Sequence, residues 1–219
     1  GFASFDDYYE SYIHSDAKFR QDYAALLDYS RELNNLLQTR KVTEAERGFL
    51  ISGILIALQN EAFTKSYRSH KTAKQLAKNL LEVIQNEFEN AKLPDDRSAD
   101  LMQAFSFISH SPALLEDKEF FTTLIHDINE NINTFIHTHE YYDTIGQFYV
   151  EFLRYANNDK GLGIVLTPHH IAELFAELGE INKDSIVFDN CCGTAGLLIA
   201  AMQKMVKDAG VDSTKIKKI

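Results

Sequence analysis

The stretch Val187–Met202 (VFDNCCGTAGLLIAAM) combines residue types that suit a small-molecule binding turn. A β-branched and aromatic run ends at Asp189, two cysteines follow, and Gly193 and Gly196 precede an apolar segment with helical character. Glycines lack a Cβ and let a ligand approach the backbone, and a helix start offers unpaired N–H groups and partial positive charge. Asp189 would add a fixed acceptor for a ligand amine or hydroxyl. The stretch therefore predicts a binding turn between a strand and a helix.

Three ligand chemistries use glycine turns of this kind. A phosphate-cradling loop needs the pattern G-x-x-x-x-G-K-[ST], and no lysine stands beside these glycines. The dinucleotide fingerprint needs G-x-G-x-x-G, of which the chain has the last two glycines. The third option is a ligand with less phosphate and more amino-acid character, such as S-adenosylmethionine. Spacing alone gives this option a preference over the other two.

The elements that would position the turn can be predicted from the flanking sequence. Ser185–Asp189 is β-branched and apolar, as in a buried parallel strand, and a helix is expected from about Gly196 to Val206. Upstream, Thr167 and Pro168 predict another helix start. That helix would continue through its apolar positions, Ile171, Leu174, Phe175 and Leu178. Strand, turn and helix form the first half of a βαβ unit, whose ligands bind outside the carboxyl end of the strand.

The region from about residue 16 to 156 has the periodicity of successive amphipathic helices, with no strand pattern. Thr43 and Glu46 have capping-box spacing, and the apolar turns after them are typical of a central helix in a bundle. Pro94 and Pro112 predict breaks. The apolar positions of three further helices are Phe19, Tyr23, Leu26, Leu27, Leu33 and Leu37; Ala73, Leu76, Ala77, Leu80, Leu81, Ile84 and Phe88; and Phe121, Leu124, Ile125, Ile128, Ile132, Phe135 and Ile136.

A polar stretch with two glycines at 157–163 predicts a domain boundary. We expect an N-terminal helical domain at 1–156 and the truncated start of a second domain at 157–219. The predicted fold class is mostly α: an N-terminal helical bundle followed by the first strand–turn–helix of a Rossmann-like α/β domain.

Composition restricts the function further. The 219 residues are 45% hydrophobic, enough for a packed core, and their net charge of −10 argues against a freestanding nucleic-acid binder. The longest apolar run, Phe49–Leu58, is shorter than the roughly 20 residues that cross a bilayer, and no signal-peptide pattern opens the chain. The only two cysteines, Cys191 and Cys192, are adjacent and cannot close a loop, which fits a reducing cytoplasm. We expect a cytoplasmic protein without membrane partners.

Three segments in fixed order carry a resemblance to a known family. They are GQFYVEFL (146–153), GIVLTPHHIAELFAEL (163–178) and FDNCCGTAGLLIAAM (188–202). Together they resemble the modification subunits of type I restriction–modification systems, which are N6-adenine DNA methyltransferases. The resemblance implies S-adenosylmethionine as cofactor, DNA as substrate, and a specificity subunit and possibly a restriction subunit as partners. It also implies the cofactor-binding residues, which are Thr167, Pro168, Asp189, Cys192, Gly193, Thr194 and Gly196.

Four positions depart from the family pattern. Asn190 replaces the usual proline, Leu197 the usual phenylalanine, Leu166 a common aromatic residue and His169 a common arginine. The loss of two aromatic side chains removes packing area around the cofactor, so we expect a lower affinity than the rest of the pattern implies.

The base-holding motif of the family, (Asn/Asp/Ser)-Pro-Pro-(Tyr/Phe), does not occur in the 219 residues. In the family this motif holds the adenine N6 amine and stacks on the flipped base. The nearest string, Ser111–Leu114, lacks the second proline and the aromatic residue and stands before the cofactor turn. We therefore expect an N-terminal fragment of a longer enzyme, ending just after the cofactor motif, with no catalytic residues and no methyl transfer of its own.

An alternative from another class is a non-catalytic helical interaction module that docks a DNA specificity subunit. One basic stretch could contact DNA phosphates or could be a solvated helix face, the more common case; its residues are Lys65, Arg68, Lys71, Lys74 and Lys78. No metal site is expected at His137 and His139, because residues two apart on a helix point to different faces. Cys191 and Cys192 are expected to be small buried residues under the turn.

Overall fold

The computed structural model describes residues 4, 12, 15–139, 148 and 167–210. It divides the chain into two compact units. We call residues 24–135 the helical unit, and the second unit comprises residues 1–23 with 136–219. The predicted domain boundary at 157 lies outside the described residues and stays a prediction. Within the described ranges no helix is long and apolar enough to cross a membrane.

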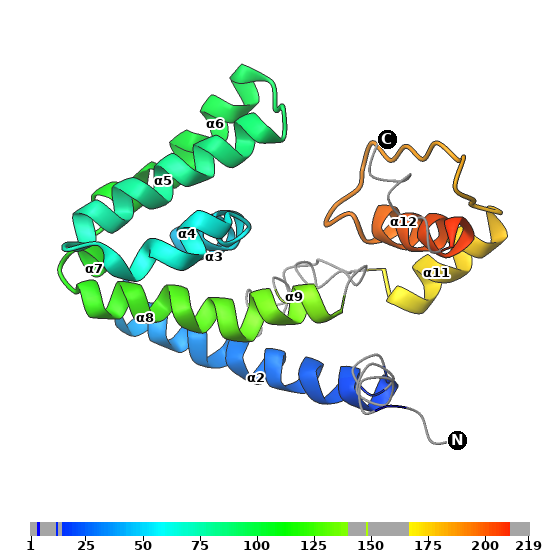
Figure 1. Cartoon of the computed structure of the whole chain (residues 1–219), viewed down its shortest axis with the longest axis horizontal. Helices are drawn as coiled ribbons and strands as arrows, with labels where there is room; N and C mark the ends of the chain where they lie inside the picture. The colour runs from blue at the N-terminus through cyan, green and yellow to red at the C-terminus, as the bar shows by residue number, and fades with distance from the viewer. Residues whose placement is uncertain (1–3, 5–11, 13–14, 140–147, 149–166, 211–219) are drawn as a thin grey trace. The chain divides into compact units, whose positions relative to one another are not determined.

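The helical unit is a bundle of short and medium-length helices (Figure 1). Its helices are α2 (Asp16–Thr39, from residue 24 on), α3 (Glu44–Leu58), α4 (Glu61–Ser66), the 3-10 turn η1 (Tyr67–Ser69), α5 (Ala73–Asn90), α6 (Asp95–Phe105), the 3-10 turn η2 (Ser106–Ser109), α7 (Pro112–Leu115), α8 (Lys118–Ile128), the π-helical segment η3 (Asn129–Asn133) and α9 (Thr134–Thr138, through residue 135). The expected breaks are present: Pro94 precedes α6, and Pro112 is the first residue of α7.

The apolar helix α3 is the centre of the helical unit, as its sequence predicts. It packs against α4, α5, α6, α8 and η3. Its start follows the expected spacing, because the Glu46 carboxylate accepts a hydrogen bond from the Thr43 amide at 3.0 Å. At Gly53 a Cβ would lie 3.0 Å from Ile84 Cδ1 and 3.1 Å from the Phe105 ring. The missing side chain therefore lets α3 lie close to α5 and α6.

The helix predicted from Phe121 to Ile136 is confirmed, but with a change of winding inside it. The chain passes from α8 into η3 and then into α9. In η3 the buried Asn133 accepts a hydrogen bond from Gln59 at 3.0 Å and donates one to Asn129 at 3.0 Å. A π turn admits one extra residue into a helical turn, and here it coincides with a buried amide that must find partners.

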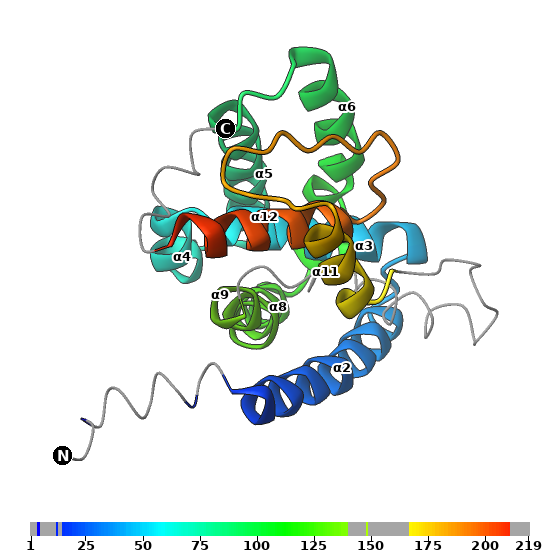
Figure 2. The same ribbon diagram turned by 90° about the vertical axis from the view of Figure 1, so that its right-hand side faces the viewer.

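In the second unit, α11 (His169–Leu178) and α12 (Gly196–Ala209) pack against each other (Figures 1 and 2). Small buried residues let the two helices approach closely; they are Ala172, Ala176, Ala200 and Ala201. Lys204 of α12 forms an ion pair with Glu177 of α11. Both predicted helix starts are confirmed, at Gly196 and one residue after Pro168.

The predicted strand Ser185–Asp189 is not confirmed, because the described residues contain no strand. The segment carries no helix or strand assignment, and Ile186 and Phe188 are 92% and 85% exposed. A strand needs the backbone groups of a neighbour to complete its hydrogen bonds, and the described part of the chain supplies no neighbour. The apolar face predicted for α11 is also largely exposed, since Leu174, Phe175 and Leu178 are 47%, 55% and 71% exposed.

Candidate functional site

The candidate site is the turn Asp189–Gly196, which we call the binding turn. Its fold comes from short local hydrogen bonds. The Asp189 carboxylate accepts from the Cys191 amide at 2.9 Å, and the Cys192 carbonyl accepts from the Ala195 amide at 2.7 Å. Gly193 and Ala195 have left-handed backbones, with φ of 54° and 67°. The chain thereby reverses within a few residues and enters α12 at Gly196.

The amides of Gly193 and Gly196 are unpaired in the described structure. Neither has an acceptor within hydrogen-bonding distance among the residues that the structure describes. A Cβ added to Gly193 would meet no atom within 4 Å, so the space beside the backbone is empty of protein. The first N–H groups of α12 have no partner inside the helix, and the helix dipole adds partial positive charge there. The binding turn thus presents donors and positive potential to an anionic or polar group.

The seven predicted cofactor residues occupy two places. Five lie in the binding turn, where Asp189, Thr194 and Gly196 are half-buried and Cys192 and Gly193 are exposed. Thr167 and Pro168 lie just before α11 and are exposed. Figure 1 shows α11 and α12 both beginning on the same side of their pair, which places the two sets at neighbouring helix starts. Their role in cofactor binding stays a prediction.

The prediction that the two cysteines are buried under the turn is wrong. Both Cys191 and Cys192 are exposed free thiols. The prediction assumed a sheet beneath the turn, and the described residues contain none. The Cys192 sulfur lies 3.8 Å from the Gly193 carbonyl oxygen and lines the open side of the turn with that backbone.

A groove of about 410 Å³ between α11 and α12 lies apart from the binding turn. Its lining includes His170, Glu173, Lys204 and Lys207, and none of the seven predicted cofactor residues contributes to it. The binding turn is therefore an open platform in the described structure, whose donors are arranged by the turn itself.

Near the other end of the second unit, His139 packs locally instead of facing a cluster of ligands. Its Nε2 lies 3.0 Å from an Asp22 carboxylate oxygen, and its ring meets Phe19 edge-on at 5.1 Å. Partial burial would raise the pKa of Asp22, but hydrogen bonds from Lys18 and His139 outweigh it and leave that pKa below its usual value. Within the described ranges no three His, Cys, Asp or Glu side chains gather as metal ligands.

Residues 140–218, which include the binding turn, match the model of the N-6 DNA methylase family. The chain is also similar to a protein of Heyndrickxia coagulans, the "Type II restriction enzyme and methyltransferase RM.BcgI". The two are 33% identical over 183 residues, which cover 78% of this chain and 28% of the relative. The chain thus spans little more than a quarter of that relative's length. No solved structure matches it.

These findings support the general class predicted from the sequence, a DNA methyltransferase region related to restriction–modification proteins. The relative is named as a type II enzyme, whereas the sequence resemblance pointed to type I modification subunits.

Proposed function

We propose that this chain is part of an adenine-N6 DNA methyltransferase of a restriction–modification system, and that the binding turn holds S-adenosylmethionine. One observation carries the proposal: within the family match, the Gly193 and Gly196 amides at the start of α12 have no acceptor among the described residues, and the space beside Gly193 is open. A helix N-terminus with free donors suits a carboxylate such as the one at the amino-acid end of S-adenosylmethionine.

Each of the predicted residues would contact a different part of the cofactor. The amides of Gly193 and Gly196 would hold the cofactor carboxylate, and Asp189 would accept from its ammonium group. One Asp189 oxygen already accepts from Cys191, so the carboxylate direction is set before a ligand arrives. Cys192 and Thr194 would line the methionine part, with Thr167 and Pro168 closing the opposite side.

S-adenosylmethionine would supply an electrophilic methyl group on a positive sulfonium. The work left to the protein is to orient the methyl acceptor in line with that group and to exclude water. In DNA this requires the target adenine to leave the base stack. The base-holding motif is absent from the 219 residues, so we propose no catalytic residue here and expect no methyl transfer by this stretch alone.

The proposal includes the Rossmann-like strand that the described residues do not form. Ile186 and Phe188 are large apolar side chains left almost fully exposed, and covering such side chains is worth about 1.5–3 kcal/mol each. With Val187 they form a short continuous apolar run, which is typical of a buried parallel strand that pairs when neighbouring strands are present. A DNA specificity subunit as partner, and possibly a restriction subunit, rests on the resemblance alone.

Calorimetric titration of the protein with S-adenosylmethionine tests the proposal. Asp189→Asn keeps an oxygen that can accept from the Cys191 amide but removes the charge, so we expect at least about tenfold weaker binding. Asp208→Asn is the matched control, since the Asp208 carboxylate likewise accepts a backbone amide, that of Lys183, at 3.0 Å. No heat of binding with the unaltered protein, or equal weakening by both variants, would refute the assignment.

A further inference from the structure

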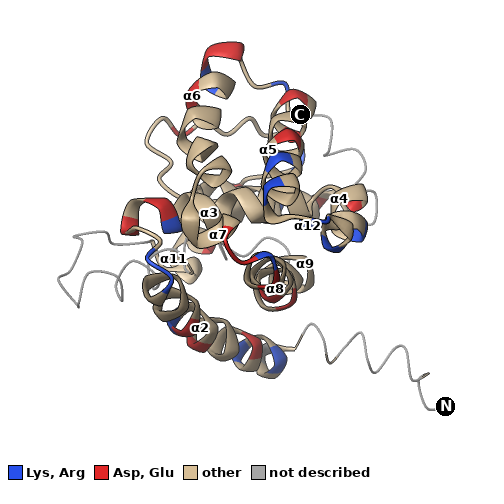
Figure 3. Cartoon of the chain, turned by 90° about the vertical axis from the view of Figure 1, so that its left-hand side faces the viewer, with Lys and Arg blue, Asp and Glu red and all other residues tan. Residues whose placement is uncertain are grey.

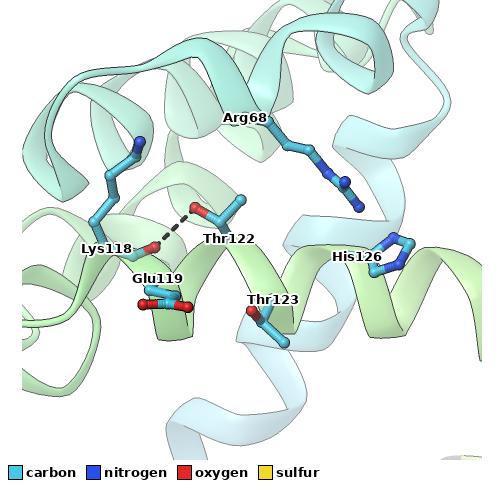
Figure 4. Close-up of a pocket in the computed structure, with 6 residues that line it drawn as sticks. All are labelled: Arg68, Lys118, Glu119, Thr122, Thr123 and His126. Carbon is cyan, nitrogen blue, oxygen red and sulfur yellow. Dashed lines mark hydrogen bonds between the residues drawn. The ribbon is translucent and has the colours of Figure 1, made fainter.

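The helical unit contains a cavity of about 500 Å³ between α8 and η1, which we call the α8 cavity. It is lined by Arg68, Lys118, Glu119, Thr122, Thr123 and His126 (Figure 4). Lys118, Thr122 and His126 stand at four-residue intervals along α8 and therefore share one face of that helix. Figure 4 shows Lys118 and Thr122 pointing from α8 toward the ribbon that carries Arg68, while Glu119 and Thr123 lie lower on the flank of α8.

Arg68 is held in place, and part of its guanidinium is left for a ligand. Its Nε donates a hydrogen bond to the Tyr67 hydroxyl at 3.0 Å, and its Cζ lies 5.5 Å from the centre of the Tyr67 ring. Tyr67 is itself buried, at 4% exposure, and so fixes the stem of the arginine. In the described part of the chain the Nη groups of Arg68 have no carboxylate partner.

Lys118 is the second cation of the α8 cavity and also has no ion pair with a described carboxylate. Its carbonyl accepts the Thr122 hydroxyl at 2.8 Å, which uses the hydrogen of Thr122 and leaves that oxygen as an acceptor. His126 lies 3.9 Å from the Glu130 carboxylate, a long and exposed contact. Glu119 is the one carboxylate of the lining and stands at its edge.

Three other cations of the helical unit are paired with carboxylates. Lys65 pairs with Glu61, Lys78 lies 3.5 Å from Glu82, and Arg40 lies 3.0 Å from Asp117. Figure 3 shows basic segments on α4 and on the first turns of α5, next to acidic ones. Of the basic stretch noted in the sequence, Arg68 is the member that lines the cavity.

We propose that the α8 cavity binds a phosphate group. The guanidinium of Arg68 offers a planar pair of donors that matches phosphate oxygens, and Lys118 adds a compact charge across the cavity. In a chain of net charge −10, two cations without a described carboxylate partner that line one hollow favour an anion there, although Glu119 at its edge reduces the net positive charge. The phosphate belongs either to a nucleic-acid backbone or to a free phosphorylated ligand. The inference does not depend on the cofactor assignment.

The test titrates the full chain with a 20-base-pair duplex and, separately, with inorganic tripolyphosphate, at several salt concentrations. Arg68→Gln and Lys118→Gln each remove one charge from the cavity. Arg97→Gln on α6 is the matched control, because it makes the same charge change at an exposed position that does not line the α8 cavity. Each cavity variant is expected to weaken binding about tenfold, and Arg97→Gln less than twofold.

The two arms separate the two sources of phosphate. If the source is a nucleic-acid backbone, duplex binding weakens, and the slope of log affinity against log salt falls by about 0.9 for each cavity variant. A free ligand would instead show cavity-dependent binding of tripolyphosphate with no effect on the duplex. The proposal is overturned if neither probe binds, or if Arg97→Gln weakens binding as much as the cavity variants do. None of these outcomes bears on S-adenosylmethionine binding, which is measured at Asp189.

Discussion

The helical unit and the segment 167–210 contain similar apolar residues, but many of these side chains are buried in the helical unit and exposed in the segment. In the helical unit Ile54, Leu80 and Phe121 have no exposed surface. In the segment around the binding turn, Leu178, Ile186 and Phe188 are 71%, 92% and 85% exposed. Helices complete their own backbone hydrogen bonds and can pair locally, whereas a strand depends on neighbours. The difference shows which part of the chain holds its own core and which part offers surfaces for further packing.

The largest effect should come from emptying the core of the helical unit. Phe121→Ala removes a fully buried ring from α8, and we expect the free energy of unfolding to fall by about 3–5 kcal/mol. Phe188→Ala is the control in the other region and should change it by less than about 0.5 kcal/mol in the 219-residue chain. Urea denaturation followed by circular dichroism measures both. Equal losses would contradict the comparison.

The same Phe188→Ala variant sharpens the comparison in a longer protein that includes sequence after residue 219. If Ser185–Asp189 pairs into a sheet there, Phe188 becomes covered, and its removal should cost about 2–4 kcal/mol. An unchanged stability in the longer protein would mean that Phe188 stays exposed, and the Rossmann-like strand would then be abandoned.

A smaller effect of opposite sign is expected at Tyr29 on α2. Its hydroxyl is buried and has no hydrogen-bond partner among the described residues. Burial contributes most to raising the pKa of the phenol above its ordinary range, and the nearby negative charges of Asp127 and Glu32 raise it further. Tyr29→Phe should therefore stabilise the helical unit by up to about 1 kcal/mol, since it removes an unsatisfied group. Tyr67→Phe is the matched control and should not stabilise, because the Tyr67 hydroxyl accepts from Arg68. Thermal unfolding of the two variants gives the comparison.

The helical unit should also respond to acid through Asp117, which caps α8. The hydrogen bond from the Phe120 amide contributes most to lowering the pKa of Asp117. Loss of hydration acts in the opposite direction, and the hydrogen bond and positive charge of Arg40 lower the pKa further. A carboxyl whose pKa is lower in the folded state adds stability above its unfolded pKa and loses it as the pH falls through the folded pKa. Asp117→Asn should flatten the decline of the urea midpoint between pH 5 and 2. An unchanged slope would remove Asp117 from the account.

The smallest effect is expected at the Lys204–Glu177 ion pair between α11 and α12. The Glu177 side chain is 60% exposed, so solvent screens the pair, and Lys204→Met should cost the helix pair no more than about 1 kcal/mol. Hydrogen exchange of the α12 amides in low salt and in 1 M salt would measure it. The variant should matter less in high salt, and a salt-independent loss would point to packing of the lysine stem instead.

The sequence predicted the helices well because their signals are local. Thr43, Pro94 and Gly196 mark helix starts within a few residues of where the structure has them, and the α5 face from Ala73 to Phe88 is buried as its spacing indicates. Leu81 is an exception on that face and is half-buried.

What failed or was missed depends on groups distant in the chain. The strand at Ser185–Asp189 and the burial of Cys191 and Cys192 both assumed neighbouring strands. The sequence does not indicate the α8 cavity, because Arg68 and Lys118 are far apart along the chain. The spacing of Lys118, Thr122 and His126 is the one local signal, since it predicts a shared polar helix face. The π turn left no periodic signal, because one added residue in a helix hardly changes the apolar spacing.

Ala195 gives the binding turn a property that a glycine would not. Its left-handed backbone, with φ of 67°, costs a residue with a Cβ on the order of 1 kcal/mol, while the same Cβ removes many alternative shapes. Fewer backbone conformations are therefore open to the loop before a ligand binds, so ordering the loop on binding costs less conformational entropy.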